Sequence, residues 1–336
     1  MKKENLIGTN VNSLLLDRNL ALEAVRVTEI AAIASSFHMG RGNEKAADQS
    51  AVNAMRDFLN ELDVNGKVVI GEGERDKAPM LYIGEVVGKG DVKVDIALDP
   101  LEGTTITAQG GENALSVLAI GEEGSFLHAP DIYMKKVAYG YKYEDLQINI
   151  DDEPNTIINE FSKFSGIREE NIVVCILDRP RHKELISQVR STGARIKLIP
   201  DGDVSAVIAT SIDESGIDLY MGTGGSPEGV LAAAALRCLG GKIYTKLIYN
   251  NDESFERAKK MGVLDKNKIY ETNDLAKGDV MFSATGVTDG TLLKGVRIIK
   301  NDAHTHSVVM RSQTNTVRYI TAKHNLNIKE YRSYFK

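Results

Sequence analysis

The sequence predicts an α/β protein whose functional side chains gather at the carboxyl ends of strands. In its second half, short apolar runs alternate with segments of helical period, and the runs lie at Asn171–Leu177, Arg195–Ile199 and Ile217–Met221. This alternation favours a largely parallel sheet whose loops collect along one edge. In the first half, the apolar strand at Val94–Leu98 leads directly into two closely spaced carboxylates.

The composition is typical of a globular protein long enough for two packed halves. The 336 residues are 42% hydrophobic and 26% charged. A net charge of −6 argues against a general nucleic-acid or membrane-surface binder. Cys175 and Cys238 lie in apolar runs without metal-ligand spacing, so we expect reduced core cysteines. We therefore expect a cytoplasmic protein that binds neither nucleic acid nor membranes.

We expect two α/β domains, at residues 18–155 and 156–336, after a leader at residues 1–17 that shows no clear period. The acidic segment 151–160, which contains a proline, is the best candidate for their boundary. Helices are predicted at Leu20–Met39 and Ala46–Leu62.

Further strands are predicted on both sides of that boundary. Lys135–Gly140 and Leu146–Ile150 could form a hairpin or two edge strands. Late strands near Val280–Ala284, Val296–Ile299 and Thr316–Ile320 are expected to complete the second sheet.

The segment Asp99–Thr104 is the first candidate for chemistry. We expect the strand Val94–Leu98 to end there, because Pro100 cannot donate to a ladder and Gly103 allows a tight turn. Two carboxylates and a threonine hydroxyl are then held at the edge where open α/β sheets bind ligands. Hard cations such as Mg²⁺ and Mn²⁺ prefer clustered carboxylates together with phosphate oxygens. Taken alone, the hexapeptide could also be an ordinary strand exit.

A second acidic exit follows the predicted strand Lys67–Ile70. Glycines alternate with carboxylates in Gly71-Glu72-Gly73-Glu74, and Asp76 follows two positions later. Carboxylates gain nothing beside a buried strand unless solvent or a cation receives them, and glycines permit close approach. This segment therefore predicts the rim of a metal site. Asp48, near the start of the second helix, either complements the helix dipole or joins that site.

The glycine-rich segment Gly222–Gly229 allows two interpretations. Ser226 suits a helix N-cap and Pro227 the first helical position, which predicts helix initiation alone. Alternatively, free N–H groups and the helix dipole could receive a phosphate. A dinucleotide-binding oxidoreductase is disfavoured, because Pro227 replaces the third glycine of the fingerprint and no P-loop lysine is present. Glu228 could complement the dipole or bind a metal.

Charged side chains also follow two strands of the second half. Arg179 and Arg181 flank a proline, and guanidinium groups suit phosphate oxygens, although paired surface arginines are often only solvated. Asp201 and Asp203 could accept bonds from sugar hydroxyls or could simply form an Asx turn.

Taken together, these motifs resemble those of class II fructose-1,6-bisphosphatase of the GlpX type, from about Leu20 to Ala322. A more distant similarity is to the lithium-sensitive, metal-dependent sugar and inositol phosphatases. The chain differs from the signature of these phosphatases at two points. Glu102 replaces the usual second Asp, and the chain has no Trp. The motifs that carry the resemblance are Gly40-Arg41-Gly42, Ala47-Asp48, Val69–Glu74, Ala78–Glu85, Asp99–Thr104, Ala129–Met134, Arg179–His182, Pro200–Asp203, Pro227–Gly229 and Ser283–Gly286.

The resemblance implies a layered α-β-α-β-α sugar-phosphatase architecture, with a metal-binding first domain and a sugar-phosphate-binding second domain. It implies two or more Mn²⁺ or Mg²⁺ ions held by Asp48, Glu72, Asp99, Glu102 and Glu228, the last replacing the missing carboxylate. Thr104 would position the attacking water or act as nucleophile, and Asp48, Glu74 or Asp76 would take the proton. The implied substrate-binding residues are Glu102, Gly103, Thr104, Tyr133, Arg179, Pro180, Arg181, Asp201, Gly202, Asp203 and Gly225.

The implied activity is hydrolysis of the 1-phosphate of fructose 1,6-bisphosphate in gluconeogenesis, by a homo-oligomer (a dimer or tetramer). Sedoheptulose-1,7-bisphosphatase activity, alone or shared, is an alternative, as is an inositol or sugar monophosphatase. The pair Arg179 and Arg181 favours a substrate with a second phosphate. A non-catalytic sugar-phosphate-binding regulator is the alternative from another class, but such a module would not need a hydroxyl beside metal-binding carboxylates.

Overall fold

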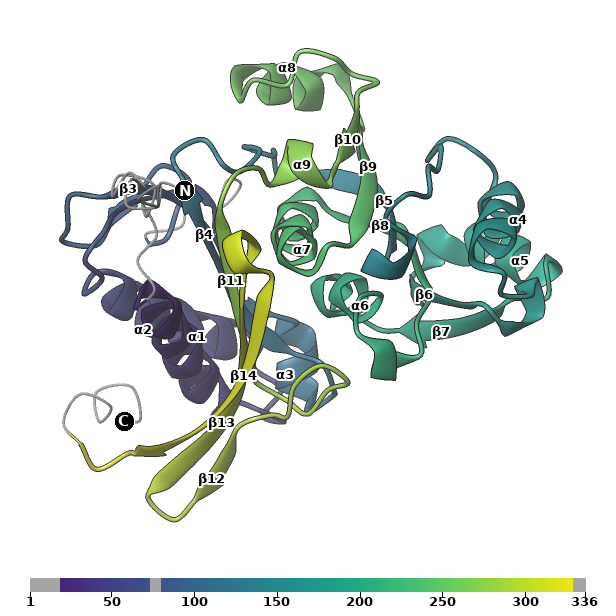
Figure 1. Ribbon diagram of the computed structural model, residues 1–336. Helices are drawn as coiled ribbons and strands as arrows, with labels where there is room; N and C mark the ends of the chain where they lie inside the picture. The colour runs from purple at the N-terminus through teal and green to yellow at the C-terminus, as the bar shows by residue number, and fades with distance from the viewer. Residues whose placement is uncertain (1–18, 73–79, 329–336) are drawn as a thin grey trace, which may run out of the picture.

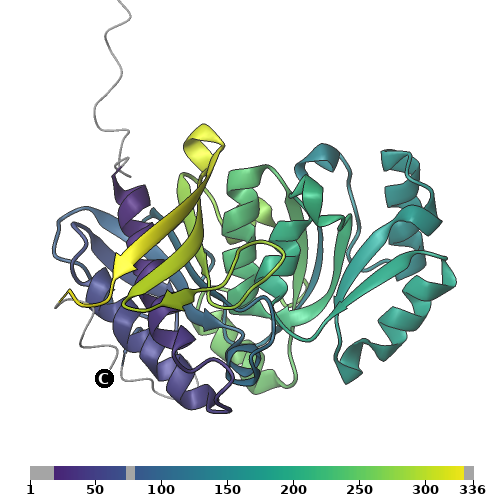
Figure 2. The ribbon, with the colours of Figure 1, turned by 90° about the horizontal axis from the view of Figure 1, so that it is seen from below.

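Five layers of helices and sheets make up the fold (Figure 1). The computed structural model describes residues 19–72 and 80–328. Helices α1 and α2 cover one sheet, α6 and α7 lie between the two sheets, and α4 and α5 cover the other sheet; the turned view shows the same order (Figure 2). The expected α-β-α-β-α layering is thus confirmed. Within the described ranges, no helix is long and apolar enough to cross a membrane.

The first sheet has eight strands in the order β12-β13-β11-β4-β3-β1-β2, with β14 paired to β13. Only β1 and β3 run parallel; the other pairs are antiparallel. The late strands belong to this sheet, where β11 pairs with β4 and β13, and β12 and β14 pair with β13, so the prediction that they complete the second sheet is wrong. The strands are β1 (Asn65–Ile70), β2 (Val86–Val87), β3 (Lys93–Glu102), β4 (Leu115–Glu122), β11 (Val280–Gly286), β12 (Arg297–Ile299), β13 (Asp302–Arg311) and β14 (Thr316–Asn325).

The second sheet has six strands in the order β10-β9-β5-β8-β6-β7. Strand β6 runs parallel to β7 and β8, whereas β5, β9 and β10 form antiparallel pairs, so the sheet is mixed rather than largely parallel. The apolar pattern of a buried strand does not encode its direction. The strands are β5 (Tyr133–Tyr139), β6 (Val173–Leu177), β7 (Arg195–Ile199), β8 (Leu219–Gly225), β9 (Lys242–Ile248) and β10 (Ile269–Glu271).

Helices α1 and α2 agree with the two segments predicted at Leu20–Met39 and Ala46–Leu62 to within three residues at each end. At the start of α2, the Asn43 side chain accepts the Ala46 N–H and so caps the helix. The helices are α1 (Leu20–Ser36), α2 (Glu44–Leu59), α3 (Thr104–Gln109), α4 (Pro154–Ser165), α5 (Lys183–Ser191), α6 (Asp203–Ala209), α7 (Ser226–Leu239), α8 (Asp252–Lys260) and α9 (Thr272–Leu275). Short 3₁₀ turns lie at Tyr141–Tyr143, Glu169–Asn171, Pro180–His182, Asp213–Ser215 and Ser312–Thr314.

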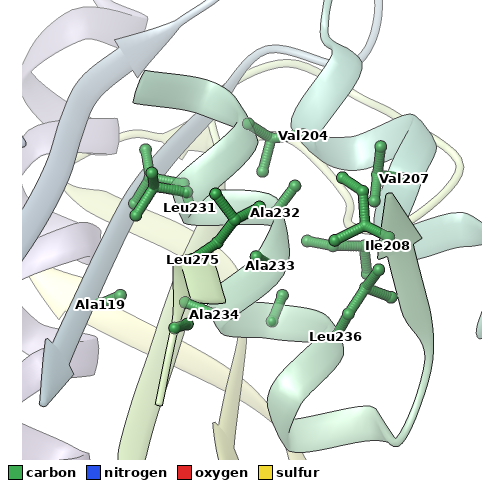
Figure 3. Close-up of a cluster of buried hydrophobic side chains, with 14 of the residues drawn as sticks. Ala119, Val204, Val207, Ile208, Leu231, Ala232, Ala233, Ala234, Leu236 and Leu275 are labelled. Atoms are coloured by element: carbon green, nitrogen blue, oxygen red, sulfur yellow. The ribbon is translucent and has the colours of Figure 1, made fainter. Parts of the chain in front are cut away.

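Helix α7 forms the centre of the hydrophobic core between the sheets. Its small residues Ala232–Ala235 are buried and let both sheets approach the helix (Figure 3). Alternate residues of β5 separate two core layers: Met134 and Ala138 face α7, whereas Val137 and Tyr139 pack beneath α4 and α5. Both cysteines are buried and free, as expected.

Strand β3 continues two residues beyond Pro100, so the prediction that the proline ends it is wrong. The ladder to β4 pairs Asp99 with Val117 and then Glu102 with Leu115, with a register shift between the two pairs. An irregularity of this kind accommodates a residue that cannot donate to the ladder.

The segment after β5 also differs from expectation. Strand β5 is central, between β8 and β9, and residues 146–150 form no strand. Their alternating apolar side chains Leu146, Ile148 and Ile150 are instead buried as coil in the core beneath α4. Helix α4 begins inside the expected boundary segment 151–160. The division into domains 18–155 and 156–336 stays a prediction.

Candidate active site

A cavity of about 570 Å³ lies where strands of both sheets end. Strands β1 and β3 from the first sheet and β6, β7 and β8 from the second all point their carboxyl ends toward it. This is the edge at which α/β sheets bind ligands. Its lining includes thirteen of the predicted site residues: Asp48, Glu72, Asp99, Glu102, Gly103, Thr104, Tyr133, Arg179, Arg181, Asp201, Asp203, Gly225 and Glu228.

Four elements of the fold bring five carboxylates into this cavity. Asp48 comes from α2, Glu72 follows β1, Asp99 and Glu102 end β3, and Glu228 lies in the first turn of α7. Residues far apart in the chain thus share one wall, which we call the acidic wall (Asp48, Glu72, Asp99, Glu102 and Glu228).

Burial raises the pKa of each carboxyl group in the acidic wall, and the charges of other wall members add to this effect at Glu72, Asp99 and Glu102. Burial, together with the charges of Asp48 and Glu228, raises the pKa of Glu72 to about 7. Burial and the charges of Glu72, Glu228 and Asp48 raise the pKa of Asp99 well above its usual range. Burial, followed by the charges of Asp203 and Asp99, does the same for Glu102. Burial also raises the pKa values of Asp48 and Glu228.

The donor set of the acidic wall fits a divalent cation. All five groups are hard oxygen donors, and the buried Oε2 atoms of Glu102 and Glu228 accept no hydrogen bond from the described residues. A cation would relieve the repulsion that raises these pKa values. Within residues 19–72 and 80–328, however, no three Asp, Glu, His or Cys side chains are arranged closely enough to hold a metal ion. The metal-binding role stays a prediction.

Glu102 also joins the two halves of the cavity. Its Oε1 accepts the Val204 backbone N–H at 3.1 Å, at the start of α6, so a residue of the first sheet caps a helix that leads from the second. Gly202, just before α6, has a φ of +85°, in the left-handed region that favours glycine. Loss of this contact would free the acidic wall from α6.

The glycines at the end of β8 make room for carboxylates. A Cβ atom at Gly224 would lie 2.1 Å from Asp203 Oδ2, and one at Gly225 would lie 1.9 Å from Glu228 Oε2. Residues Gly222–Gly225 are strand rather than loop. Ser226 is the first helical residue, not the N-cap, and its hydroxyl donates to the Pro130 carbonyl. Gly224 and Gly225 thus leave space for the carboxylates of Asp203 and Glu228. The sequence pattern does not reveal this role.

Thr104 begins α3 beside the acidic wall. The preceding Gly103 has a φ of +95°, in the left-handed region that favours glycine, and turns the chain from β3 into the helix. The turn directs the start of α3 toward the cavity, and both Gly103 and Thr104 line that cavity. This agrees with the tight turn predicted at Gly103.

The second sheet supplies two arginines to the same cavity. A guanidinium nitrogen of Arg179 lies 3.6 Å from an Asp201 carboxylate oxygen. Arg181 donates from Nε to the Thr223 carbonyl at 2.9 Å, and its guanidinium lies 4.8 Å from the centre of the Tyr133 ring. These contacts hold both positive groups at the cavity before a ligand arrives.

A buried histidine fixes the turn that carries these arginines. His182 Nδ1 donates to the Leu177 carbonyl at 2.7 Å, and its Nε2 accepts the Thr223 N–H at 2.8 Å. This pairing requires the neutral ring. Burial, with a smaller contribution from Arg181, lowers its pKa and favours that form.

Some predicted residues are placed differently, and some cavity residues were not predicted. Pro180 and Gly202 do not line the cavity but connect residues that do. Glu74 and Asp76 lie outside the described residues. The lining also contains Asp131 and Asn250, which the sequence analysis assigned no role. Asp131 lies in the motif Ala129–Met134, and that motif was the sequence signal that could have identified it. Asn250 lies in no such motif and reaches the cavity only through the fold.

The layered α/β fold places a cavity lined by carboxylates and arginines at the ends of its strands. The sequence model of a family described as bacterial fructose-1,6-bisphosphatase, glpX-encoded, matches residues 18–324. The chain belongs to this family, and the resemblance found in its motifs is confirmed.

Three relatives are similar over nearly their whole lengths, and each is a D-fructose 1,6-bisphosphatase class 2/sedoheptulose 1,7-bisphosphatase. The protein of Synechococcus sp. (strain JA-3-3Ab) is 42% identical over 344 residues, 95% of this chain and 99% of that protein. That of Synechococcus sp. (strain JA-2-3B'a(2-13)) is 43% identical over 335 residues, covering 92% and 96%. That of Trichodesmium erythraeum (strain IMS101) is also 43% identical over 335 residues, covering 92% and 97%.

Among solved structures, extragenic suppressor protein SuhB from Bartonella henselae is similar at 13% sequence identity and a TM-score of 0.35. The match covers 58% of this chain and 74% of that one. No argument below depends on it.

Proposed function

We propose that this protein is a metal-dependent phosphatase that hydrolyses the 1-phosphate of D-fructose 1,6-bisphosphate, releasing fructose 6-phosphate and phosphate. One observation carries the proposal: a single cavity is lined by the five carboxylates of the acidic wall and by an arginine pair. A sugar with a phosphate at each end matches both sides, one phosphate joining cations at the acidic wall and the other pairing with the arginines.

Asp48, Glu72, Asp99, Glu102 and Glu228 would hold two or more divalent cations, Mn²⁺ or Mg²⁺, beside the 1-phosphate. When bound, such cations supply Lewis acidity toward phosphate oxygens and make a water molecule more acidic. Asp48, Asp99, Glu102 and Glu228 lie on elements packed in the core (α2, β3 and α7), and Glu72 follows the packed strand β1.

Thr104 is the side chain that would act directly in the attack on phosphorus. Its hydroxyl, at the start of α3, would position the attacking water or act as the nucleophile on phosphorus. The backbone N–H groups of Gly103 and Thr104 would bind the phosphate oxygens. Asp48, Glu74 or Asp76 would take the proton.

The second sheet would bind the rest of the substrate. Arg179 and Arg181 suit the 6-phosphate. The guanidinium of Arg181 lies over the ring of Tyr133. Asp201 and Asp203 would accept sugar hydroxyls. A monophosphatase would gain nothing from the arginine pair, and a non-catalytic regulator would gain nothing from Thr104 beside the acidic wall.

A shared activity toward sedoheptulose 1,7-bisphosphate is the second candidate, because the three similar relatives carry both activities in their names. The two substrates place a phosphate at each end of a sugar. We place the enzyme in the cytoplasm and in gluconeogenesis, as a homo-oligomer with no nucleic-acid or membrane partner.

The test is phosphate release by the purified protein with Mn²⁺, with Mg²⁺ and with EDTA. Substrates are fructose 1,6-bisphosphate, sedoheptulose 1,7-bisphosphate, inositol 1-phosphate and fructose 6-phosphate. We expect metal-dependent release from the bisphosphates and a KM for them at least about tenfold higher in Arg181→Ala. Arg168→Ala, which removes an exposed arginine paired with Glu170, is the matched control. Release mainly from inositol 1-phosphate would contradict the role of the arginines, and binding without release would favour a regulator.

A further inference from the structure

We propose that Lys136 is a positioning residue that holds the Asp203 carboxylate from behind the cavity wall, so that Asp203 can accept a sugar hydroxyl. The inference rests on the proposed function, because it assigns Lys136 to recognition of that substrate. Neither the motifs nor the cavity lining points to this lysine.

The contact itself is short and buried. Lys136 lies on β5, its side chain is fully buried, and its Nζ donates to Asp203 Oδ2 at 2.6 Å. The Tyr220 hydroxyl donates to the same oxygen at 3.4 Å. Asp203 lines the cavity, whereas Lys136 does not. Oδ2 is thus engaged by the protein, and Oδ1 is the oxygen available to a ligand.

The surrounding backbone is shaped around this ion pair. A Cβ atom at Gly224 would lie 2.1 Å from Asp203 Oδ2 and 3.2 Å from Lys136 Nζ, and one at Gly229 would lie 3.3 Å from Lys136 Cε. Strand β8 and helix α7 therefore both lack a side chain where the lysine passes. Lys136 shares a strand face with Met134 and Ala138, which belong to the apolar core against α7. A lysine among such neighbours needs a polar partner, and Asp203 is that partner.

The charges near Asp203 explain why it needs a cation. Glu102 and Glu228 are its acidic neighbours, and the charge of Asp203 contributes to the raised pKa of each. The charge of Lys136 acts in the opposite direction on Glu228. Without the lysine, Asp203 would face these carboxylates with no buried positive charge at its back and would turn away from them. This change removes an oriented acceptor for the sugar.

A purely structural role makes a different prediction. If Lys136 only balanced charge within the core, its loss would lower stability but leave the KM of the folded enzyme unchanged. If it positions Asp203, its loss raises the KM for the sugar bisphosphate while kcat changes little, because Thr104 and the acidic wall are intact.

The experiment compares Lys136→Met, Asp203→Asn and the double variant with the wild type, using steady-state phosphate release from fructose 1,6-bisphosphate with Mn²⁺. We expect KM to rise about 10- to 100-fold in Lys136→Met, the range of a lost charge-assisted hydrogen bond, with kcat within about threefold. The double variant should match Asp203→Asn within about threefold, because the lysine acts through the aspartate. The control is Lys246→Met, which removes a lysine of the neighbouring strand β9 that pairs with Asp151. This variant should keep the wild-type KM.

Two outcomes overturn the proposal: a folded Lys136→Met with wild-type KM, or a double variant whose KM rises at least tenfold beyond that of Asp203→Asn. If Lys136→Met does not fold, the comparison between Asp203→Asn and the double variant, which leaves no unpaired buried charge, gives the answer. Calorimetric binding of fructose 1,6-bisphosphate in EDTA separates this proposal from the proposed function. A wild type that neither binds nor hydrolyses this sugar overturns both; normal binding by Lys136→Met overturns the present proposal alone.

Discussion

Replacing Gly224 with alanine tests whether the end of β8 is shaped by the carboxylate beside it. The new methyl would lie 2.1 Å from Asp203 Oδ2, whereas ordinary contacts begin near 3.4 Å. One group must therefore move by about 1.3 Å, the difference between those distances, which would lengthen the 2.6 Å contact to Lys136 to about 3.9 Å, beyond hydrogen-bond range. Overpacking costs about 1–3 kcal/mol and the lost charged hydrogen bond about 1.5–3 kcal/mol, so we expect a loss of roughly 2.5–6 kcal/mol.

The matched control is Gly222→Ala, two residues earlier on the same face of β8. A Cβ atom there would lie 3.4 Å from its nearest neighbours, His182 and the Tyr220 hydroxyl, and neither glycine has a positive φ. Urea unfolding should show Gly222→Ala within about 1 kcal/mol of the wild type. Gly224→Ala should melt roughly 3–7 °C lower by calorimetry. Equal stability of the two variants would refute the steric argument.

Three further predictions follow from the site. Thr104→Ala should lower kcat at least about 100-fold with little change in KM, while Thr104→Ser retains activity; more than a tenth of wild-type activity in the alanine variant would contradict the assigned role. Saturating Mn²⁺, at about 100 times its Kd, should stabilise the protein by about 2.7 kcal/mol in a thermal-shift assay, and Glu72→Gln should reduce this gain. Because burial lowers the folded-state pKa of His182, the unfolded chain binds more protons there, so stability should fall as pH drops below about 6.5. The thermal midpoint of His182→Gln should fall less between pH 7.5 and 5.5, and parallel curves would contradict this.

The sequence predicted those parts of the fold that depend on local pattern. The strand–helix alternation located β6, β7 and the helices after them, because buried strands and amphipathic helices have distinct periods. The same reasoning located Asp99 and Glu102 at one edge, since the carboxyl ends of neighbouring strands meet there. The layered architecture came from the resemblance of the motifs rather than from periodicity.

Features that depend on contacts distant in sequence were not predictable in this way. The direction of β5 and the pairing of β11 with β4 leave no mark on their apolar patterns. The role of Gly224 depends on where Asp203 comes to lie. The pattern of Lys135–Gly140 allows a hairpin strand or an edge strand, and nothing in it marks Lys136 as a buried residue. Its buried partner becomes visible only once α6 is in place.

The most direct test of the central claim is ³¹P NMR of fructose 1,6-bisphosphate incubated with the purified wild type and Mg²⁺. If the proposed function is correct, the 1-phosphate resonance disappears while equal amounts of inorganic phosphate and fructose 6-phosphate form. EDTA then stops the reaction. Formation of fructose 1-phosphate would mean that the substrate binds with its ends reversed relative to the acidic wall and the arginine pair. An unchanged spectrum with Mg²⁺, and again with Mn²⁺ followed by removal of the metal, would contradict the claim that this cavity is a bisphosphatase site.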